Sequence, residues 1–205
     1  MLTFPHRFAL RAGESPPGPV YQARQVHGAS VVVVRGDEPL SEIRAIEADA
    51  LIAAAPGVTV GVRTADCVPA LIEDTTAGLC AAVHAGWRGL LAGVLEATLP
   101  RLVELGARTE RLRVALGPCI GPCCFEVGEE VAEKFAPEHV RRARPRPYVD
   151  LRAAAMARLH AAGVRLVASD VPCTRCDPGR YYSYRRDGQG TPHHLHTIGV
   201  PLPRP

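Results

Sequence analysis

Short apolar runs separated by turn residues dominate the first half of the chain. The runs with the length of strands cover residues 30–34, 48–55, 58–63, 68–74 and 78–86. Each is bounded by Gly, Pro, Asp or Thr, as is typical of sheet strands joined by tight connections. A later run, RLRVALG at 111–117, has the same character. The pattern therefore predicts a β-rich core.

Helical spacing replaces the strand pattern over residues 89–107. The apolar residues that lie near the helical repeat are Leu90, Leu91, Val94, Leu95, Leu102 and Leu105. Within this stretch Pro100 predicts a kink or a second helix start, and Gly106 predicts the C-terminal stop.

Two shorter helices are predicted further on, over residues 127–135 and 150–163. Asp150 is placed to cap the start of the second helix, and Gly163 is placed to end it. The Arg- and Pro-rich segment 136–150 has no periodicity. It indicates a solvated surface loop rather than a binding patch.

The composition excludes several classes of protein. With 205 residues, 47% of them hydrophobic, the chain can bury a substantial core, and we expect a single domain over residues 1–205. No apolar run approaches the ~20 residues of a membrane-spanning helix. A formal net charge of +3 is too small to indicate a nucleic-acid-binding protein. The absence of GxGxxG, P-loop and GxSxG motifs disfavours the familiar nucleotide folds and the serine hydrolases.

The N-terminal segment and the cysteines predict a cytoplasmic protein. The stretch MLTFPHRFALRAGESPPG has neither the long apolar region nor the small-residue cleavage site of a secretory signal. The seven cysteines are an odd number, and the chain is longer than the small secreted domains that need a disulfide framework. Reduced thiols or thiolate metal ligands are therefore favoured.

The first candidate for chemistry is His84, in the stretch AAVHAGWRG at residues 81–89. It stands at the end of a strand-like run, three residues before the only tryptophan, Trp87. A single histidine in an apolar segment is more often a buried core residue than a ligand. The interpretation of His84 therefore depends on whether other polar residues converge on it.

Two further polar residues occupy similar positions at strand ends. His27 precedes the run 30–34, and Cys67 lies between the runs 58–63 and 68–74. Catalytic zinc sites have three protein ligands and one open position, and two histidines with one cysteine would supply such a set. The scattered spacing also leaves separate core or turn roles open for the three residues.

Several motifs, taken in order, carry a resemblance to a known family. They are QVHG, ADALI, RTADCVPALI, AAVHAGWRG, GPCIGPCCFEVGEEV and YYSYRRDG, and they extend over about residues 22–190. In this order they closely resemble the YfiH-like family, also called multicopper polyphenol oxidase or laccase-domain proteins and now purine nucleoside phosphorylases. The resemblance implies an α+β fold of the CNF1/YfiH-like type, with a mixed β-sheet core flanked by helices.

The resemblance also implies a metal and an activity. His27, Cys67 and His84 are expected to bind one Zn²⁺, with Cu²⁺ as the other candidate metal. The expected reaction is phosphorolysis of adenosine, inosine, guanosine or methylthioadenosine to the free base and ribose 1-phosphate. Deamination of adenosine is expected as a side activity of the same site, because zinc lowers the pKa of bound water to ~7.

Residues beside the motifs are candidates for the remaining roles. Cys67 and His84 belong to the expected catalytic centre, and Asp66 is a candidate for supporting a ligand histidine or for proton transfer. Guanidinium groups match phosphate oxygens two at a time, so the arginines next to the motifs are candidate phosphate ligands. Those arginines are Arg63, Arg88, Arg185 and Arg186, of which Arg88 and Arg185 are preferred. The candidates for stacking on the purine are Tyr181, Tyr182 and Phe125.

Three alternative functions stay open at this point. One is a copper-dependent polyphenol oxidase, although a multicopper cluster needs more paired histidines than this chain has. Another is a hydrolase in which Cys67 is the nucleophile and His84 its base. The last is a non-catalytic metal-binding domain. The presence of His27 beside the other two residues favours a metal site over a nucleophile.

The chain departs from the family pattern in two places. The stretch between FPHRFALRAGESPPGP and VYQARQVHG is shorter than usual and lacks an SLNLG-like motif, which puts part of the pocket wall in doubt. After SYRRDG the family commonly has TGR, whereas this chain has QGTPHHLHTIG. The usual arginine has no match, so His193, His194 or His196 either replaces it or faces solvent.

The other cysteines are predicted to have no metal. The stretch GPCIGPCCFEVG at 117–128 contains Cys119, Cys123 and Cys124 at poor ligand spacings, and its glycines and prolines favour a rigid turn. Cys173 and Cys176 form a CxxC pair without a second pair in the sequence. A structural zinc site is therefore not predicted there.

Overall fold

A six-stranded mixed sheet forms the centre of the molecule in the computed structural model, which describes residues 1–11, 16, 18–142 and 145–203. Its strand order is β10-β7-β5-β6-β3-β2, with two parallel pairs, β2 with β3 and β7 with β10. The strands are β2 (Val31–Val34), β3 (Ala50–Ala53), β5 (Val68–Asp74), β6 (Leu79–Ala85), β7 (Arg113–Leu116) and β10 (Leu166–Ala168). All of these except β10 lie within the predicted runs.

The central strands are buried on both faces, which explains their continuous apolar sequences. Every residue of β3, β5 and β6 is buried. Because successive side chains of a strand point to opposite faces, Ile72 packs in one apolar cluster and Leu71 in another. The sheet therefore needs a covering layer on each side.

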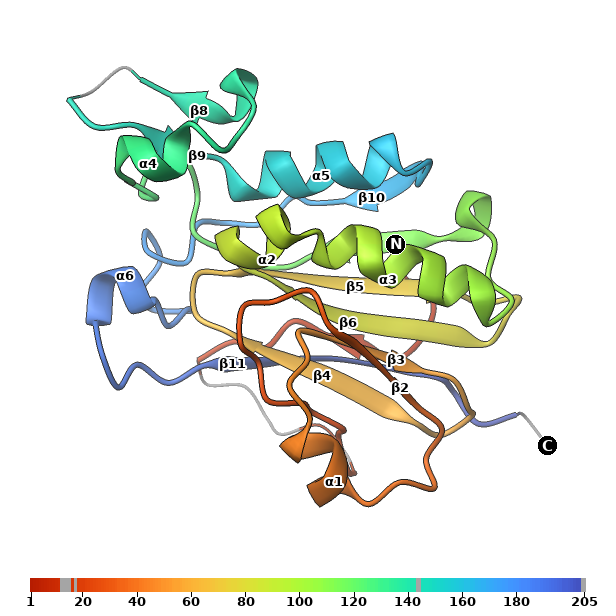
Figure 1. Cartoon of the computed structure of the whole chain (residues 1–205). Coiled ribbons are helices and arrows are strands. Elements are labelled where there is room, and N and C mark those ends of the chain that lie inside the picture. The colour runs from red at the N-terminus through yellow and green to blue at the C-terminus, as the bar shows by residue number, and fades with distance from the viewer. Residues whose placement is uncertain (12–15, 17, 143–144, 204–205) are drawn as a thin grey trace.

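A three-stranded antiparallel sheet covers one face. It consists of β1 (His6–Arg7), β11 (His194–Gly199) and β4 (Thr59–Thr64), in the order β1-β11-β4. Val60 and Ile198 of this small sheet share a buried cluster with Leu51 and Leu71 of the large one. In Figure 1, β4 and β11 run along the side of the large sheet opposite to its main helices.

Helices cover the other face. These are α2 (Trp87–Ala92), α3 (Val94–Glu104) and α5 (Leu151–Ala161), and Figure 1 shows them stacked above the large sheet. The predicted helix 89–107 is interrupted at Gly93, which has φ +84° and joins α2 to α3. The second helix start predicted as one alternative at Pro100 was wrong, because the left-handed Gly93 makes the break and Pro100 lies inside α3. The predicted cap is confirmed, since Asp150 accepts a hydrogen bond from the backbone N–H of Ala153 at 3.0 Å.

Short elements complete the described part of the chain. They are α1 (Leu40–Ala45), η1 (Thr109–Arg111), α4 (Glu129–Ala132), η2 (Pro137–His139), β8 (Val140–Arg141), β9 (Tyr148–Val149) and α6 (Tyr184–Asp187). The segment predicted as a loop over 136–150 therefore contains a two-residue strand pair, except that residues 143 and 144 lie outside the described chain. No helix in the described ranges is both long and apolar enough to cross a membrane.

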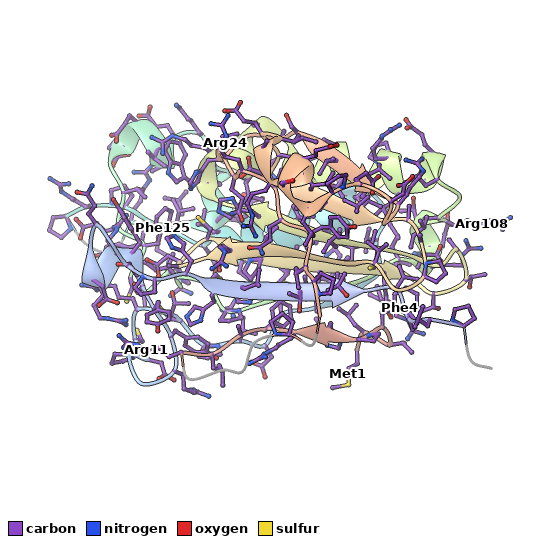
Figure 2. The ribbon with its side chains drawn as sticks, turned by 90° about the horizontal axis from the view of Figure 1, so that it is seen from below. Met1, Phe4, Arg11, Arg24, Arg108 and Phe125 are labelled. Carbon is purple, nitrogen blue, oxygen red and sulfur yellow. The ribbon has the colours of Figure 1, made fainter. Side chains whose placement is uncertain are left out.

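The observed architecture is α+β, a mixed sheet flanked by helices, as the sequence predicted. Arg108 and Phe125 mark the two opposite ends of the large sheet (Figure 2). Arg108, near the end of the sheet where Asp74 terminates β5, donates its backbone N–H to the Asp74 carboxylate at 3.0 Å. Phe125 lies at the opposite end of the molecule in Figure 2. That opposite end, which contains the start of β5 and the end of β6, holds the candidate site.

Candidate functional site

Strand register brings the predicted ligands together. Val68 and Pro69 at the start of β5 pair with Ala85 and His84 at the end of β6. Cys67 directly precedes β5, so it lies at the same edge of the sheet as His84.

The side chains of His27, Cys67 and His84 form one compact group. Their potential ligand atoms all lie within 4.8 Å of one another. The Nε2 atom of His27 is 4.0 Å from the Cys67 sulfur, and the two imidazole centroids are 4.7 Å apart. Two imidazole nitrogens and one thiolate are a donor set that fits zinc in a site with one position left open. Copper accepts the same donors.

Gly86 permits this close approach. A Cβ atom at this position would lie 2.9 Å from the Cys67 sulfur and 3.1 Å from Cδ2 of His27. Both contacts are shorter than ordinary van der Waals separations. The glycine of the HAGW stretch is therefore required by the packing of the ligand group.

Asp49 holds the two histidines in place, and the sequence reasoning missed it. This fully buried carboxylate accepts a hydrogen bond from His84 Nδ1 at 2.7 Å, which leaves Nε2 of His84 available to bind a metal. It also accepts the backbone N–H groups of Val26, His27 and Gly28 at 3.1, 3.0 and 2.7 Å. The sequence shows only an aspartate directly before the apolar stretch 50–53, and its contact with His84 follows from the pairing of β3 with β6.

The buried charges of this group shift its pKa values. Burial alone would lower the pKa of His84, but the hydrogen bond to Asp49 and the neighbouring Cys67 raise it to about 9. Burial alone would raise the pKa of the Cys67 thiol, yet His27 and His84 lower it to about 7. The group therefore favours a thiolate at position 67.

The hydrogen-bond partners of Asp66 are groups other than the ligand histidines. Its carboxylate accepts hydrogen bonds from Thr174 Oγ1 at 2.5 Å, from Ser183 Oγ at 3.0 Å and from the backbone N–H of Arg185 at 2.7 Å. The carboxylate that contacts a ligand histidine is instead that of Asp49. Asp66 thus holds two later segments of the chain, one at Thr174 and one at residues 183–185, next to Cys67.

Left-handed backbone conformations occur at two non-glycine residues of the described chain, and both belong to this site. His27 has φ +60° and Asp66 has φ +94°. Such conformations cost free energy and persist where the surroundings fix them. The Asp49 carboxylate fixes the first, because it accepts three successive N–H groups around His27, and the three donors to Asp66 fix the second.

The metal-ligand group lies in the wall of a cavity of about 670 Å³. This volume is in the range of cavities that bind small molecules and cofactors. Three of the arginines that were predicted as phosphate ligands, Arg63, Arg88 and Arg185, line the same cavity. The structure thus brings together the three predicted metal ligands and three of the four arginines that the sequence selected.

The three arginines are held without carboxylate partners among the described residues. Arg63 Nε donates to Gln22 Oε1 at 2.8 Å. The Arg88 guanidinium lies over the Trp87 ring, with Cζ 4.3 Å from the ring centroid. Arg185 donates to the backbone carbonyl of Glu126 at 2.6 Å. Their charges are therefore open to an anion in the cavity.

Arg186, in contrast, forms its interactions with other groups of the protein. It pairs with the neighbouring Asp187 at 2.7 Å and donates to the carbonyls of Thr174, Arg175 and Tyr181. These contacts hold the segment that precedes α6 against the helix.

Of the aromatic and histidine residues that were candidates for contacting substrate, some line the cavity and others are buried in the protein. Phe125 lines the cavity, whereas Tyr181 packs against His194 with ring centroids 5.9 Å apart. His193 is exposed at the cavity, but His194 and His196 are buried in β11. Of the three histidines, only His193 is placed to contact a ligand of the site.

Four of the remaining cysteines lie together, contrary to the prediction from the sequence. Cys123, Cys124, Cys173 and Cys176 come together, with their sulfur atoms within 4.8 Å of one another. The expectation that the CxxC pair has no second pair was wrong, because the vicinal pair at 123 and 124 reaches it through the fold. Cys119 is buried beside this group but does not belong to it.

Comparisons with known proteins agree with this architecture. A family model described as multi-copper polyphenol oxidoreductase laccase matches residues 6–200. A Pseudomonas aeruginosa protein named purine nucleoside phosphorylase is 45% identical over 173 residues, which are 80% of this chain and 68% of that protein. A protein from an unknown prokaryotic organism, named adenosine deaminase RL5, is 38% identical over 180 residues, covering 80% and 69% of the two chains.

A solved structure shows the same fold. The crystal structure of Bacillus licheniformis YfiH superposes with a TM-score of 0.82 at 25% identity, covering 88% of this chain and 74% of that one. The family match over most of the chain and the relatives named as enzymes lead to one conclusion. This chain is an enzyme of the YfiH family, the multi-copper polyphenol oxidoreductase laccase family of the matching model.

Proposed function

We propose that this enzyme is a zinc-dependent purine nucleoside phosphorylase that also deaminates adenosine. One observation carries the proposal: the ligand group of His27, Cys67 and His84 shares a cavity with three arginines that no described carboxylate neutralises. A nucleophilic anion and a metal ion are thereby accommodated next to each other. The relatives named purine nucleoside phosphorylase and adenosine deaminase support the same two activities.

The proposed substrates are purine nucleosides and inorganic phosphate. Adenosine, inosine, guanosine and methylthioadenosine share the purine and the ribose and differ at the edges of the molecule. In phosphorolysis a phosphate oxygen forms a bond to C1′ of the ribose while the bond from C1′ to the purine nitrogen breaks. The departing base takes the electron pair of that bond and a proton, and the products are the free base and ribose 1-phosphate.

The arginines provide the binding energy for the phosphate. Arg88 and Arg185 approach the cavity from different elements, the start of α2 and α6, and Arg63 approaches from β4. Guanidinium groups hold phosphate oxygens through paired, charge-assisted hydrogen bonds. Holding the phosphate against the ribose reduces the entropic part of the barrier. We assign Asp66 the role of positioning Arg185, because it accepts the backbone N–H of that residue at 2.7 Å.

Zinc, when bound by His27, Cys67 and His84, supplies a Lewis acid and lowers the pKa of bound water to ~7, which is the chemistry that deamination requires. The protein contributes the orientation of the ligands through Asp49 and a cavity wall that includes Phe125, whose ring offers a stacking surface for the purine. Thiolate ligands need a reducing environment, and we propose the cytoplasm as the location.

The donor groups do not favour a multicopper oxidase. In the described ranges, the groups that have metal-ligand geometry are the set of two histidines and one cysteine and the set of four cysteines. Multicopper clusters are built mainly from histidines, and copper at the first set would be a single ion. A thiol hydrolase is the second candidate, because the Cys67 sulfur lies 4.0 Å from His27 Nε2 and the two histidines lower the pKa of its thiol to about 7.

The test is a product assay combined with metal analysis. Purified protein is incubated with adenosine, with and without phosphate, and the products are separated by chromatography. We expect adenine, hypoxanthine and ribose 1-phosphate only with phosphate, inosine in both cases, and loss of the active-site metal and of both activities in Cys67→Ala. His160→Ala, which removes an exposed histidine of α5, is the matched control. Full activity of metal-free protein, with inactivation by a thiol-alkylating reagent, would support the hydrolase instead.

A further inference from the structure

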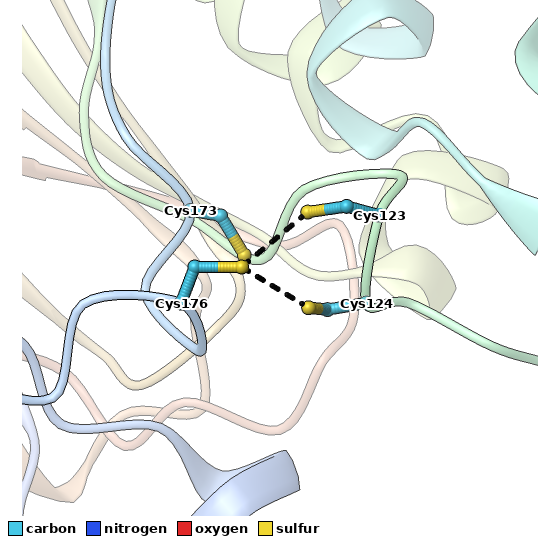
Figure 3. A group of neighbouring side chains, drawn as sticks. All are labelled: Cys123, Cys124, Cys173 and Cys176. Carbon is cyan, nitrogen blue, oxygen red and sulfur yellow. Dashed lines mark hydrogen bonds between the residues drawn. The ribbon is translucent and has the colours of Figure 1, made fainter.

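Four cysteine side chains from two distant segments converge at the surface next to the active site. Cys123 and Cys124 lie in the turn after β7, and Cys173 and Cys176 lie in the segment before α6. Figure 3 shows the thiols of the two segments facing each other. We propose that this tetracysteine cluster (Cys123, Cys124, Cys173 and Cys176) is a second metal site, a structural zinc centre.

The sulfur positions suit tetrahedral coordination. The Cys176 sulfur is 3.7 Å from that of Cys123 and 3.4 Å from that of Cys124. In a tetrahedron with Zn–S bonds of ~2.3 Å, neighbouring sulfurs are about 3.8 Å apart. All four sulfurs lie within 4.8 Å of one another, so a small inward movement completes such a tetrahedron.

The turn makes adjacent cysteines usable as ligands. In a strand, neighbouring side chains point to opposite faces, but residues 122–124 form a turn, and both thiols face the CxxC pair. Gly121 brings the turn against the second segment, because a Cβ atom there would lie 3.2 Å from both Cys123 Sγ and Cys173 Cβ. Its backbone N–H also donates to the Cys173 sulfur at 3.2 Å, an interaction that stabilises a thiolate.

The surroundings suit a negatively charged centre. Binding one Zn²⁺ releases the four thiol protons to solvent and leaves a net charge of about −2 on the cluster. The Arg175 guanidinium, between the two cysteines of the CxxC pair, interacts electrostatically with Cys124 and offsets part of that charge. Arg186 donates to the carbonyls of Thr174 and Arg175 at 3.1 and 3.2 Å and so fixes the segment that contains both thiols.

A closed set of four thiolates is typical of structural zinc rather than catalytic zinc. The first segment continues from Cys124 directly into Phe125, which lines the cavity. The second contains Thr174, which donates to Asp66 beside Cys67. A metal ion that joins the two segments would therefore hold the cavity wall against the active-site turn, without contacting substrate.

The proposal does not depend on the phosphorylase activity, because its test counts metal ions and thiols. We expect about two zinc ions per wild-type chain, and about one in Cys176→Ser, in Cys123→Ser and in Cys67→Ala. Cys123 and Cys176 are exposed, so changing them to serine removes little packing. Cys80→Ala, which alters a buried cysteine of β6 outside both groups, is the control that should keep both ions.

A second measurement identifies the ligands of the cluster from the absorption spectrum of the protein loaded with cobalt. Cobalt substituted at the cluster should show intense thiolate-to-metal charge-transfer absorption that persists in Cys67→Ala and is lost in Cys176→Ser. The proposal is overturned if the wild type holds a single zinc that Cys67→Ala removes, or if iron occupies the cluster. It is also overturned if titration of unfolded, unreduced, metal-stripped protein finds fewer than the seven thiols of the chain, since that result assigns the cluster to disulfides.

Discussion

Asp49 Oδ1 lies 2.7 Å from His84 Nδ1, and both groups are buried. The same carboxylate accepts three backbone N–H groups from the loop that contains His27. One side chain therefore sets the ring orientation of one ligand and the backbone conformation of another. This relationship ties the loop that contains His27 to the edge of the sheet that contains His84.

Asp49→Asn should weaken metal binding although it preserves the shape of the side chain. Each carboxylate oxygen of Asp49 accepts two hydrogen bonds. In asparagine an NH₂ group replaces one of these oxygens, and because it is itself a donor it cannot accept the two hydrogen bonds at that position. Loss of such a supporting partner typically lowers metal affinity 10- to 100-fold. Competition with a chromophoric chelator measures the affinity. Glu47→Gln, which removes an exposed carboxylate that pairs with Arg24, should leave it unchanged.

Gly86→Ala should weaken metal binding without changing any ligand. The backbone at Gly86, φ −71° and ψ 168°, is open to alanine, so the effect arises from the new methyl group. That group would press on the Cys67 sulfur at 2.9 Å and on His27 at 3.1 Å. Gly179→Ala is the control, because its Cβ would make only an ordinary contact of 3.7 Å. Equal zinc affinity in the two variants would show that the ligand group tolerates displacement.

His196 should make the fold sensitive to acid. The ring is fully buried in β11 beside Thr64 and His194, and its Nε2 lies 3.0 Å from Thr64 Oγ1. Burial, together with the nearby His194, lowers its pKa from 6.5 to about 3. Below pH 6.5 the unfolded chain takes up a proton that the folded protein excludes, so stability falls as the pH falls. At pH 5 this linkage costs about 2 kcal/mol.

The measurement compares denaturant unfolding of the wild type and His196→Gln at pH 7 and pH 5. A chelator is present throughout, so that release of metal at low pH does not contribute. Glutamine can keep the hydrogen bond to Thr64 but does not titrate. The variant should lose less free energy of unfolding between the two pH values, whereas His160→Gln on the exposed face of α5 should behave as the wild type. Identical losses in wild type and His196→Gln would contradict the assignment.

The sequence reasoning succeeded where a local pattern determines the structure. The buried strands β3, β5 and β6 are apolar along their whole length, and Asp150 has the spacing of a helix cap. It failed where polar residues occupy buried positions. The strand β11 has the sequence HLHTIG, and its two histidines concealed a strand that pairs with β4.

Long-range pairing explains what the sequence left out of the candidate site. Nothing near Asp49 shows that it will meet His84, because that contact depends on the register of β3 against β6. The tetracysteine cluster similarly depends on the parallel bridge between Cys119 and Cys173. The three predicted metal ligands could be selected because the family motifs supplied the correspondence that their spacing lacks.

Phosphate binding separates the two proposed activities of the site. Arg88 and Arg185 line the cavity, and each rests on an aromatic ring, Trp87 at 4.3 Å and Phe125 at 5.2 Å, rather than on a carboxylate. Phosphorolysis requires the anion that these residues would hold, whereas deamination requires only water. Substitution should therefore affect the two reactions unequally.

Arg88→Ala and Arg185→Ala should each slow phosphorolysis of adenosine roughly ten- to hundredfold, because a charge-assisted hydrogen bond contributes ~1.5–3 kcal/mol. Deamination should slow much less, and bound zinc should stay at the wild-type level, so the ratio of ribose 1-phosphate to inosine should fall. Lysine at either position should restore the ratio only in part, since an ammonium group keeps the charge but not the planar fork. Arg44→Ala, an exposed arginine of α1 outside the cavity, is the matched control. The ratio is measured across phosphate concentrations, and a parallel decline of both activities would show that these arginines position the nucleoside or support the fold instead.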